Sequence, residues 1–140
     1  MAGVHFLFDD ITQLIRLHIG LSNRIDENRS ESFTILYCDL TNFSNVVIKS
    51  GLEKVLRTSD TIVNYGSDYF FILPYTDKYG AGIVKKIFED FFKEEIKTYM
   101  VAYPGDGETP KTLLAELQNG ASRLHKNDIE CLNPIVFEGL

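Results

Sequence analysis

The sequence lacks tryptophan and has only two cysteines, Cys38 and Cys131, which form neither a disulfide framework nor a metal-ligand spacing. So few thiols are typical of a reducing compartment, and we expect a cytoplasmic protein. The chain also lacks a signal peptide and any apolar run long enough to cross a bilayer, which argues against a membrane protein. Positive charge is scarce as well. With 14 basic and 20 acidic residues, the net charge of −6 argues against binding to nucleic acid or to an anionic membrane.

The remaining composition is that of an ordinary globular protein. Hydrophobic residues make up 44% of the chain and charged residues 24%, which excludes general disorder. A length of 140 residues suffices for one sizeable core, and the chain contains no internal repeat. We therefore expect a single domain over residues 1–140.

The apolar pattern predicts several strands, two of which form a β-hairpin. Two β-favouring runs, residues 61–65 and 69–73, flank the short connector Gly66-Ser67-Asp68. Residues 33–40 are almost continuously apolar, as expected for a central strand that is covered on both faces. Further strands are expected at residues 96–104 and, at the edge of the sheet because of Pro134, at residues 133–137.

Helical spacing of apolar residues predicts the elements between these strands. An N-terminal helix over residues 9–25 leads into a polar loop at residues 22–32. In residues 77–92 two rows repeat every four positions, and we expect both to face the core: Ile83-Ile87-Phe91 and Val84-Phe88-Phe92. The other helices are expected at residues 42–57 and from Thr109 onward.

The order of these elements indicates an α+β fold. Strand, helix, hairpin, helix and strand form the β-α-β-β-α-β palm of the ferredoxin-like type, with a central antiparallel sheet flanked by helices. The prediction adds a helix at the N-terminus, and a helix and a strand at the C-terminus.

The hairpin carries a resemblance to a known family. Gly66-Ser67-Asp68-Tyr69-Phe70 resembles the Gly-Gly-(Asp/Glu)-Glu-Phe signature of GGDEF domains, the catalytic domains of diguanylate cyclases. As in that family, an Arg-x-x-Asp motif, Arg57 and Asp60, precedes the hairpin. The segment Val101-Ala102-Tyr103-Pro104 is similar to another family motif. The resemblance extends over essentially the whole chain and implies the same palm fold.

The same comparison shows a damaged catalytic site. The resemblance implies that Asp39 and Asp68 match the metal-binding carboxylates of active cyclases, but Tyr69 replaces the essential glutamate. Thr41 replaces a second aspartate, and Val47 stands where the family reads guanine with an asparagine. A valine cannot hydrogen-bond a base. We therefore predict no cyclase activity, no required cofactor, and at most weak Mg²⁺ binding by a vestigial pair of carboxylates.

The Arg-x-x-Asp motif suggests a ligand. In the family this motif binds cyclic di-GMP at an inhibitory site. A guanidinium can donate to O6 and N7 of guanine, and a carboxylate can accept from the N1–H and N2–H groups of guanine. Arg57 and Asp60 must then both be exposed on one side of their turn. Lys86 could supply a second cation, although lysine lacks the bidentate fork of arginine. The alternative is an ordinary surface ion pair.

Two functions follow from these patterns. The first is a catalytically inactive GGDEF-like signalling domain that receives cyclic di-GMP through Arg57, Asp60 and Lys86 and signals through contact with a protein partner or a second copy of itself. The second is a scaffold that binds no nucleotide. A residual cyclase is a third, less favoured hypothesis.

Overall fold

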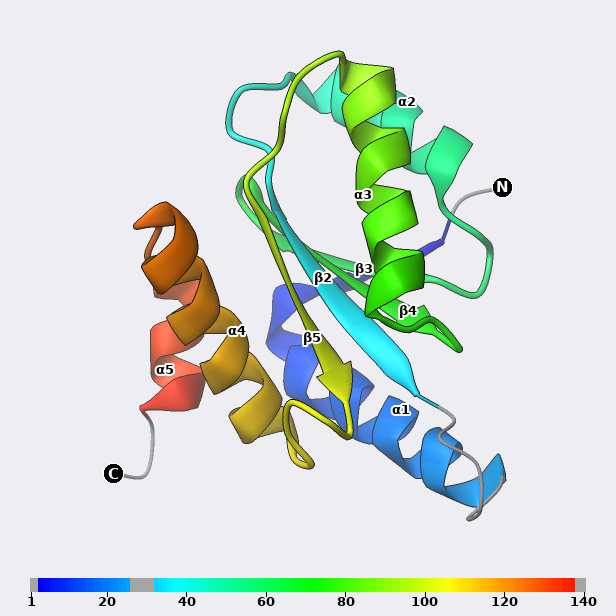
Figure 1. Cartoon of the computed structure of the whole chain (residues 1–140), viewed down its shortest axis with the longest axis vertical. Helices are drawn as coiled ribbons and strands as arrows, with labels where there is room; N and C mark the ends of the chain where they lie inside the picture. Colours follow the sequence, from blue (N-terminus) through cyan, green and yellow to red (C-terminus); the bar gives the residue numbers. More distant parts are fainter. Residues whose placement is uncertain (1–2, 26–31, 138–140) are drawn as a thin grey trace.

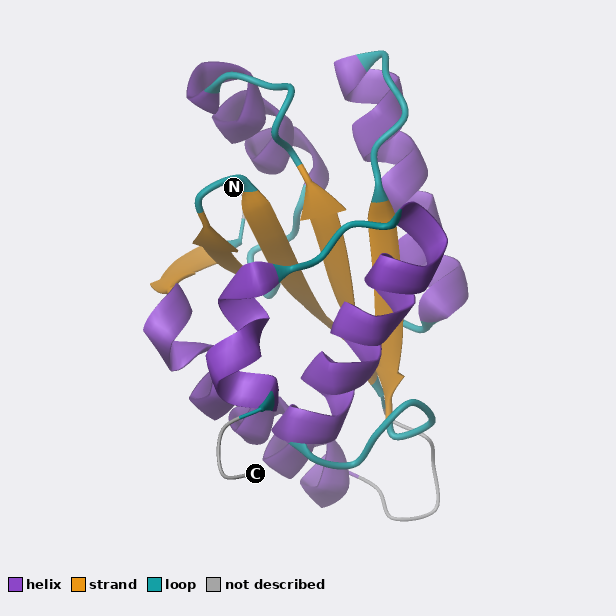
Figure 2. Cartoon of the chain, turned by 90° about the vertical axis from the view of Figure 1, so that its left-hand side faces the viewer, coloured by secondary structure: helices purple, strands orange, loops and turns teal. Residues whose placement is uncertain are grey.

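The computed structural model describes residues 3–25 and 32–137, and within them a five-stranded sheet lies between two layers of helices (Figures 1 and 2). The strand order is β1-β3-β4-β2-β5. All neighbouring strands are antiparallel except β1 and β3, which are parallel. The strands are β1 (Val4–Leu7), β2 (Phe33–Asp39), β3 (Thr61–Tyr65), β4 (Asp68–Pro74) and β5 (Thr98–Tyr103).

The helices divide between the two faces of the sheet, as Figure 1 shows. One face carries α2 (Asn45–Val55) and α3 (Lys78–Phe92). The other carries α1 (Ile11–Ile25), which follows the short η1 (Phe8–Asp10), α4 (Pro110–His125), η2 (Glu130–Leu132) and α5 (Asn133–Val136). This arrangement confirms the predicted α+β class. None of the described helices is long and apolar enough to cross a membrane.

Two separate cores follow from the alternation of side chains along the central strands. Tyr37 and Phe70 are buried towards α1 and α4, whereas Leu36 and Phe71 are buried towards α2 and α3. Because successive strand residues point to opposite faces, a strand covered on both sides must be apolar throughout. The apolar run that began at Phe33 has this property, and the prediction of a central strand is confirmed.

Strand β1 was not predicted. The run Val4-His5-Phe6-Leu7 is short and mostly apolar, but its four residues are all exposed, so no core face marks it as a strand. It pairs with β3, and the Val4 N–H donates to the carbonyl of Asp60 at 2.9 Å. The sheet therefore extends by one parallel strand beyond the palm core, directly beside the turn that holds Asp60.

The predicted closing strand at residues 133–137 is wrong. Those residues form α5, which follows η2 and packs under α4 instead of at the sheet edge. Proline in the first turn of a helix loses no intrahelical hydrogen bond, so Pro134 is as compatible with α5 as with an edge strand. Burial of Leu132 and Val136 against the α1 and α4 layer favours the helix.

Two predicted core faces are smaller than expected. On α3 the row Val84-Phe88-Phe92 packs on the sheet, but Ile83 and Ile87 are exposed. On α1 the residue Leu21 is likewise exposed. A core stripe therefore covers less of each helix than the apolar pattern suggested. Most of the predicted polar loop, residues 26–31, lies outside the described residues.

Candidate functional site

The β3–β4 hairpin ends in a two-residue turn. Tyr65 and Asp68 are paired residues, so Gly66 and Ser67 alone connect the strands. Gly66 has a φ of 59°, in the left-handed region that glycine adopts without strain. The side-chain amide of Asn64 donates to the Gly66 carbonyl at 2.9 Å. This turn places Asp68 at the first position of β4.

Asp39 and Asp68 lie directly opposite one another on β2 and β4. Paired residues of antiparallel strands project from the same face, so the predicted placement of both carboxylates at one end of the sheet is confirmed. Asp39 accepts from the backbone N–H of Thr41 at 3.1 Å and from its hydroxyl. The position where the family has a second aspartate thus supplies a hydrogen-bond donor to the first.

Asp68 is held by a second set of partners. The Tyr37 hydroxyl donates to Asp68 Oδ1 at 2.6 Å, and Asn127 Nδ2 donates to the Tyr37 oxygen at 3.0 Å. The Cys131 Sγ lies 4.0 Å from Asp68 Oδ2. Asn127 and Cys131 follow α4, so the C-terminal segment closes over this carboxylate. Sequence reasoning missed this network. Tyr37 and Asp39 are two residues apart on one strand and so share a face, which could have indicated Tyr37 as a partner of the carboxylates. The contact of Asn127 could not have been predicted, because it depends on how the C-terminal helices pack.

The environment of Asp68 disfavours its charged form. Burial raises the pKa of Asp68, the Tyr37 hydroxyl offsets part of that rise, and the charges of Asp39 and Glu130 raise it further. Burial and the neighbouring Asp68 charge also raise the pKa of the Cys131 thiol to about 12, so that thiol is neutral near pH 7.

Both carboxylates at the hairpin tip are engaged in hydrogen bonds. Asp68 Oδ1 is already bonded to Tyr37, and Asp39 Oδ1 to Thr41. No group of three or more potential metal ligands occurs among the described residues. Tyr69 is buried on the opposite face of the sheet, where it stacks on Phe71, and so does not reach the carboxylates. A hydrogen-bonded network thus surrounds the hairpin-tip carboxylates in the described residues.

The pH dependence of stability tests this description of Asp68. A carboxyl whose folded-state pKa is raised binds more protons in the native than in the unfolded state. Its contribution to the free energy of unfolding is therefore full below the ordinary pKa of 3.8, and it is lost as the pH rises through the folded-state pKa. Asp68→Asn should abolish this part of the pH profile and raise the free energy of unfolding near pH 7. Urea unfolding across pH measures both effects. Two results would contradict the raised pKa of Asp68: a variant that is less stable than wild type near pH 7, or a variant whose stability still falls as the pH rises through the same range.

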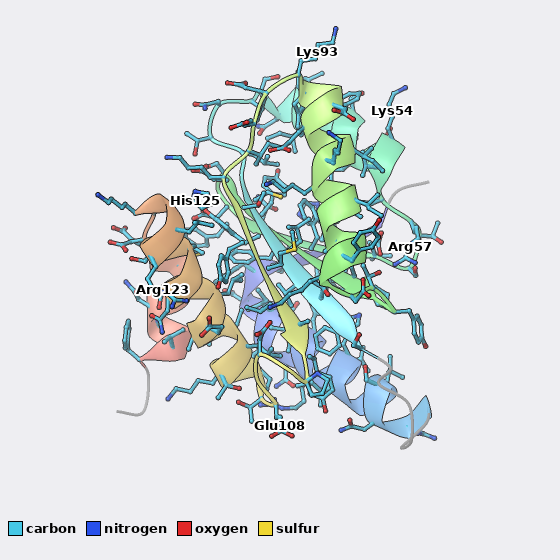
Figure 3. The ribbon with its side chains drawn as sticks, in the orientation of Figure 1. Lys54, Arg57, Lys93, Glu108, Arg123 and His125 are labelled. Carbon is cyan, nitrogen blue, oxygen red and sulfur yellow. The ribbon has the colours of Figure 1, made fainter. Side chains whose placement is uncertain are left out.

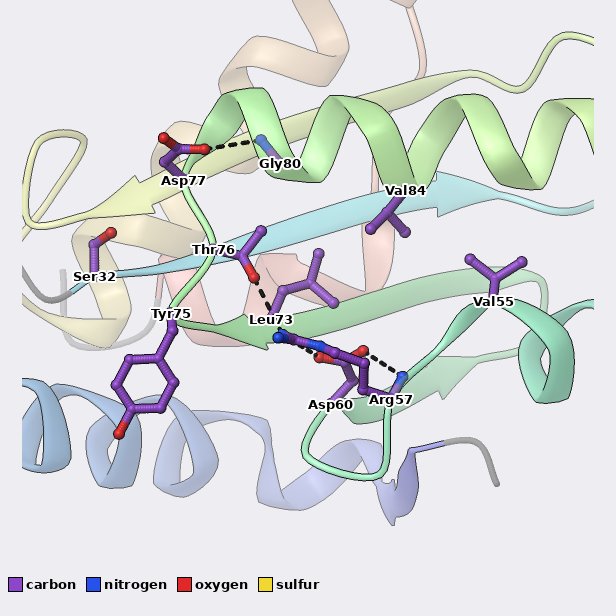
Figure 4. Close-up of a pocket in the computed structure, with 10 residues that line it drawn as sticks. All are labelled: Ser32, Val55, Arg57, Asp60, Leu73, Tyr75, Thr76, Asp77, Gly80 and Val84. Atoms are coloured by element: carbon purple, nitrogen blue, oxygen red, sulfur yellow. Dashed lines mark hydrogen bonds and ion pairs between the residues drawn. The ribbon is translucent and has the colours of Figure 1, made fainter.

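Arg57 and Asp60 close the turn between α2 and β3 (Figure 4). The Asp60 carboxylate accepts from the Arg57 backbone N–H at 2.8 Å and from Arg57 Nη2 at 3.0 Å. The same Nη2 donates to the carbonyl of Pro74 at 2.9 Å and lies 3.2 Å from the Thr76 hydroxyl. The pair therefore joins the α2–β3 turn to the end of β4.

The exposure predicted for this pair is wrong for Asp60. The Arg57 side chain is 54% exposed, but the Asp60 side chain is only 3% exposed. Both of its oxygens face Arg57, and strand β1 lies against its backbone. A carboxylate in this position cannot accept from N1–H and N2–H of a guanine in the surrounding solvent.

Arg57 borders a cavity of about 510 Å³ between the ends of α2, β4 and α3. Thr76, Asp77 and Gly80 line its other side, where the Asp77 carboxylate caps α3 by accepting from the Gly80 N–H at 2.8 Å. Figure 3 places Arg57 on the side of α2 and α3, away from His125 on α4. Lys86, the candidate second cation, is exposed on α3 and is not among the residues that line this cavity. The structure thus brings Arg57 and Asp60 together but leaves Lys86 outside.

Comparison with solved structures agrees with the fold. The GGDEF domain of YfiN (TpbB) from Pseudomonas aeruginosa superposes with a TM-score of 0.68 over 94% of both chains at 15% identity. A sensory box/GGDEF family protein from Caulobacter crescentus gives 0.66 over 86% of this chain and 93% of that one, at 12% identity. A DGC protein from Thermotoga maritima gives 0.63 over 83% and 95%, at 14% identity. The chain therefore has the fold of a GGDEF domain. No protein-family model and no curated protein sequence matches it significantly.

Proposed function

We propose that this chain is a catalytically inactive, GGDEF-like signalling domain that acts through contact with another protein or with a second copy of itself. The observation that carries the proposal is the hydrogen bonding of Asp68, whose Oδ1 accepts from the Tyr37 hydroxyl at 2.6 Å. A palm that transfers a phosphoryl group needs ionised carboxylates that hold a divalent cation. Here the same position supports the C-terminal segment.

Guanine recognition is also poorly supported. Val47, at the position that reads guanine in the family, lies exposed in the first turn of α2 and has no side-chain hydrogen-bonding group. Ser44 stands where the Asp-x-Asp-x-Phe-Lys motif of GGDEF domains ends in lysine, and its hydroxyl caps α2 by accepting from the Val47 N–H at 3.3 Å. The Ser44 hydroxyl thus caps a helix, and the Val47 side chain can form no hydrogen bond to a base.

Protein contact is supported by the surface of α3. Tyr79, Ile83 and Ile87 are exposed and spaced four residues apart, so they form an apolar row along the outside of the helix. A row of this kind is a common docking feature of helices. Both cysteines, Cys38 and Cys131, are free, which suits the cytoplasmic setting that we also propose.

A cyclic di-GMP receptor is the second candidate. The half-exposed Arg57 guanidinium beside a 510 Å³ cavity favours it. The burial of Asp60 speaks against it, because Asp60 could then only orient Arg57 and could not read the Watson–Crick edge of guanine. We therefore rank the protein-contact function first.

Incubation with GTP tests the absence of catalysis. Purified protein with GTP and Mg²⁺ or Mn²⁺ should produce no cyclic di-GMP above background, as resolved by chromatography, because Asp68 is engaged by Tyr37 and the described residues hold no group of three potential metal ligands. The proposal would be overturned by sustained turnover that Asp68→Ala abolishes and that an exposed-residue control, Glu53→Ala, leaves unchanged.

A further inference from the structure

A second cavity, of about 230 Å³, lies next to the Arg57 cavity and shares Ser32 and Tyr75 with it. Its walls come from α1, the start of β2 and the end of β4, through His18, Phe33 and Pro74. Figure 4 shows the Tyr75 ring pointing away from Arg57, towards α1. This second cavity is therefore distinct from both the hairpin tip and the Arg57–Asp60 pair.

His18 gives the cavity one oriented polar group. Its Nδ1 lies 2.8 Å from the Leu14 carbonyl, and because a carbonyl can only accept, Nδ1 carries the proton of the neutral ring. The ring is 9% exposed and packs on Phe33 with centroids 5.6 Å apart. Nε2 is then a hydrogen-bond acceptor, and within the described part of the chain Nδ1 is the His18 nitrogen with a hydrogen bond.

The rest of the lining limits what could bind. Leu21, Phe33, Pro74 and the Tyr75 ring are largely apolar, and the remaining lining residues of the cavity, apart from His18, are serines. No charged side chain from the described residues lines it, which favours a neutral ligand. The volume is below the range of about 300–1,000 Å³ that is usual for drug-sized ligands, which restricts the ligand to one or two rings.

We propose that this cavity binds a neutral, planar aromatic heterocycle of about the size of indole, whose ring N–H donates to His18 Nε2. Aromatic faces match the apolar walls, and the ring N–H can donate to His18 Nε2. The cavity is lined by α1, by Ser59 of the α2–β3 turn and by Tyr75 of the β4–α3 loop, so a bound ring would connect these three segments. The proposal does not depend on the protein-contact function.

Titration of the isotope-labelled protein with indole and with 1-methylindole, followed by NMR, tests the proposal. Indole should shift the His18 ring signals and the Phe33 and Tyr75 amides saturably. 1-Methylindole should bind at least about tenfold more weakly, because it leaves Nε2 without a donor. Hypoxanthine, which also carries ring N–H groups but is more polar, should bind more weakly than indole. If hypoxanthine binds more tightly than indole, the cavity prefers a purine-like ligand, and the inference that its apolar walls select an apolar ring is wrong.

Three variants make the result specific. In His18→Phe the preference for indole over its methylated analogue should disappear, whereas His5→Phe, at an exposed histidine on β1, should leave it unchanged. Leu21→Trp should block the cavity from its exposed rim, and it serves if His18→Phe does not fold. Absence of saturable shifts at the solubility limit of indole, equal affinity of the two indoles, or full binding by Leu21→Trp would each overturn the proposal.

Discussion

Replacing Leu132 with alanine should lower the free energy of unfolding by about 3 kcal/mol. Leu132 ends η2 and is fully buried against the core formed with α1 and α4. Truncating it leaves a cavity that the well-packed surroundings fill only in part, which adds to the lost transfer free energy. Urea unfolding measures the change.

Phe137→Ala is the matched control for this experiment. Phe137 lies five residues later in the same C-terminal segment but is 55% exposed, so its truncation should cost less than about 0.5 kcal/mol. Equal, small losses of stability for both variants would show that the C-terminal segment does not pack against α1 and α4 as described.

Arg57→Ala should lower the free energy of unfolding by about 2 kcal/mol. Removing one member of a buried ion pair commonly costs 3–5 kcal/mol because the remaining charge is uncompensated, and the partial exposure of Arg57 reduces that figure here. The variant keeps the backbone N–H that donates to Asp60 but loses the bonds to the carboxylate, to Pro74 and to Thr76. Adding Asp60→Asn should recover part of the loss.

An exposed ion pair elsewhere in the chain provides the control for Arg57. Arg123 and Glu116 on α4 lie 3.2 Å apart, and both side chains are solvent-accessible. Arg123→Ala should therefore change stability by less than about 0.5 kcal/mol. If Arg57→Ala is equally mild, or if the Arg57–Asp60 double-mutant cycle shows no coupling, the pair is an ordinary surface pair and its structural role is refuted.

The parts of the fold that were predictable are those in which local pattern and burial agree. The run from Phe33 is apolar because both faces of β2 are covered, and the hairpin has both its β-favouring flanks and Gly66 at the position with positive φ. Asp39 and Asp68 were placed together correctly, because strand ends on adjacent antiparallel strands must meet.

The burial of Asp60 was not predicted, because it depends on contacts between segments that are far apart in the sequence. Strand β1 is exposed along its length, yet its Val4 N–H bonds the Asp60 carbonyl. A Cβ on the neighbouring Gly3 would lie 2.6 Å from that same oxygen, which shows how closely the strand approaches. Three-residue spacing puts Arg57 and Asp60 on one side of the turn but does not indicate which side is covered.

Calorimetric titration with cyclic di-GMP tests most directly whether Arg57 and Asp60 form a structural pair instead of a guanine site. We predict no saturable heat up to high micromolar ligand, because Asp60 is buried with both oxygens directed at Arg57. A saturable isotherm in the wild-type protein, lost in an Arg57→Ala variant that still unfolds cooperatively, would contradict this. The domain would then be a receptor for cyclic di-GMP.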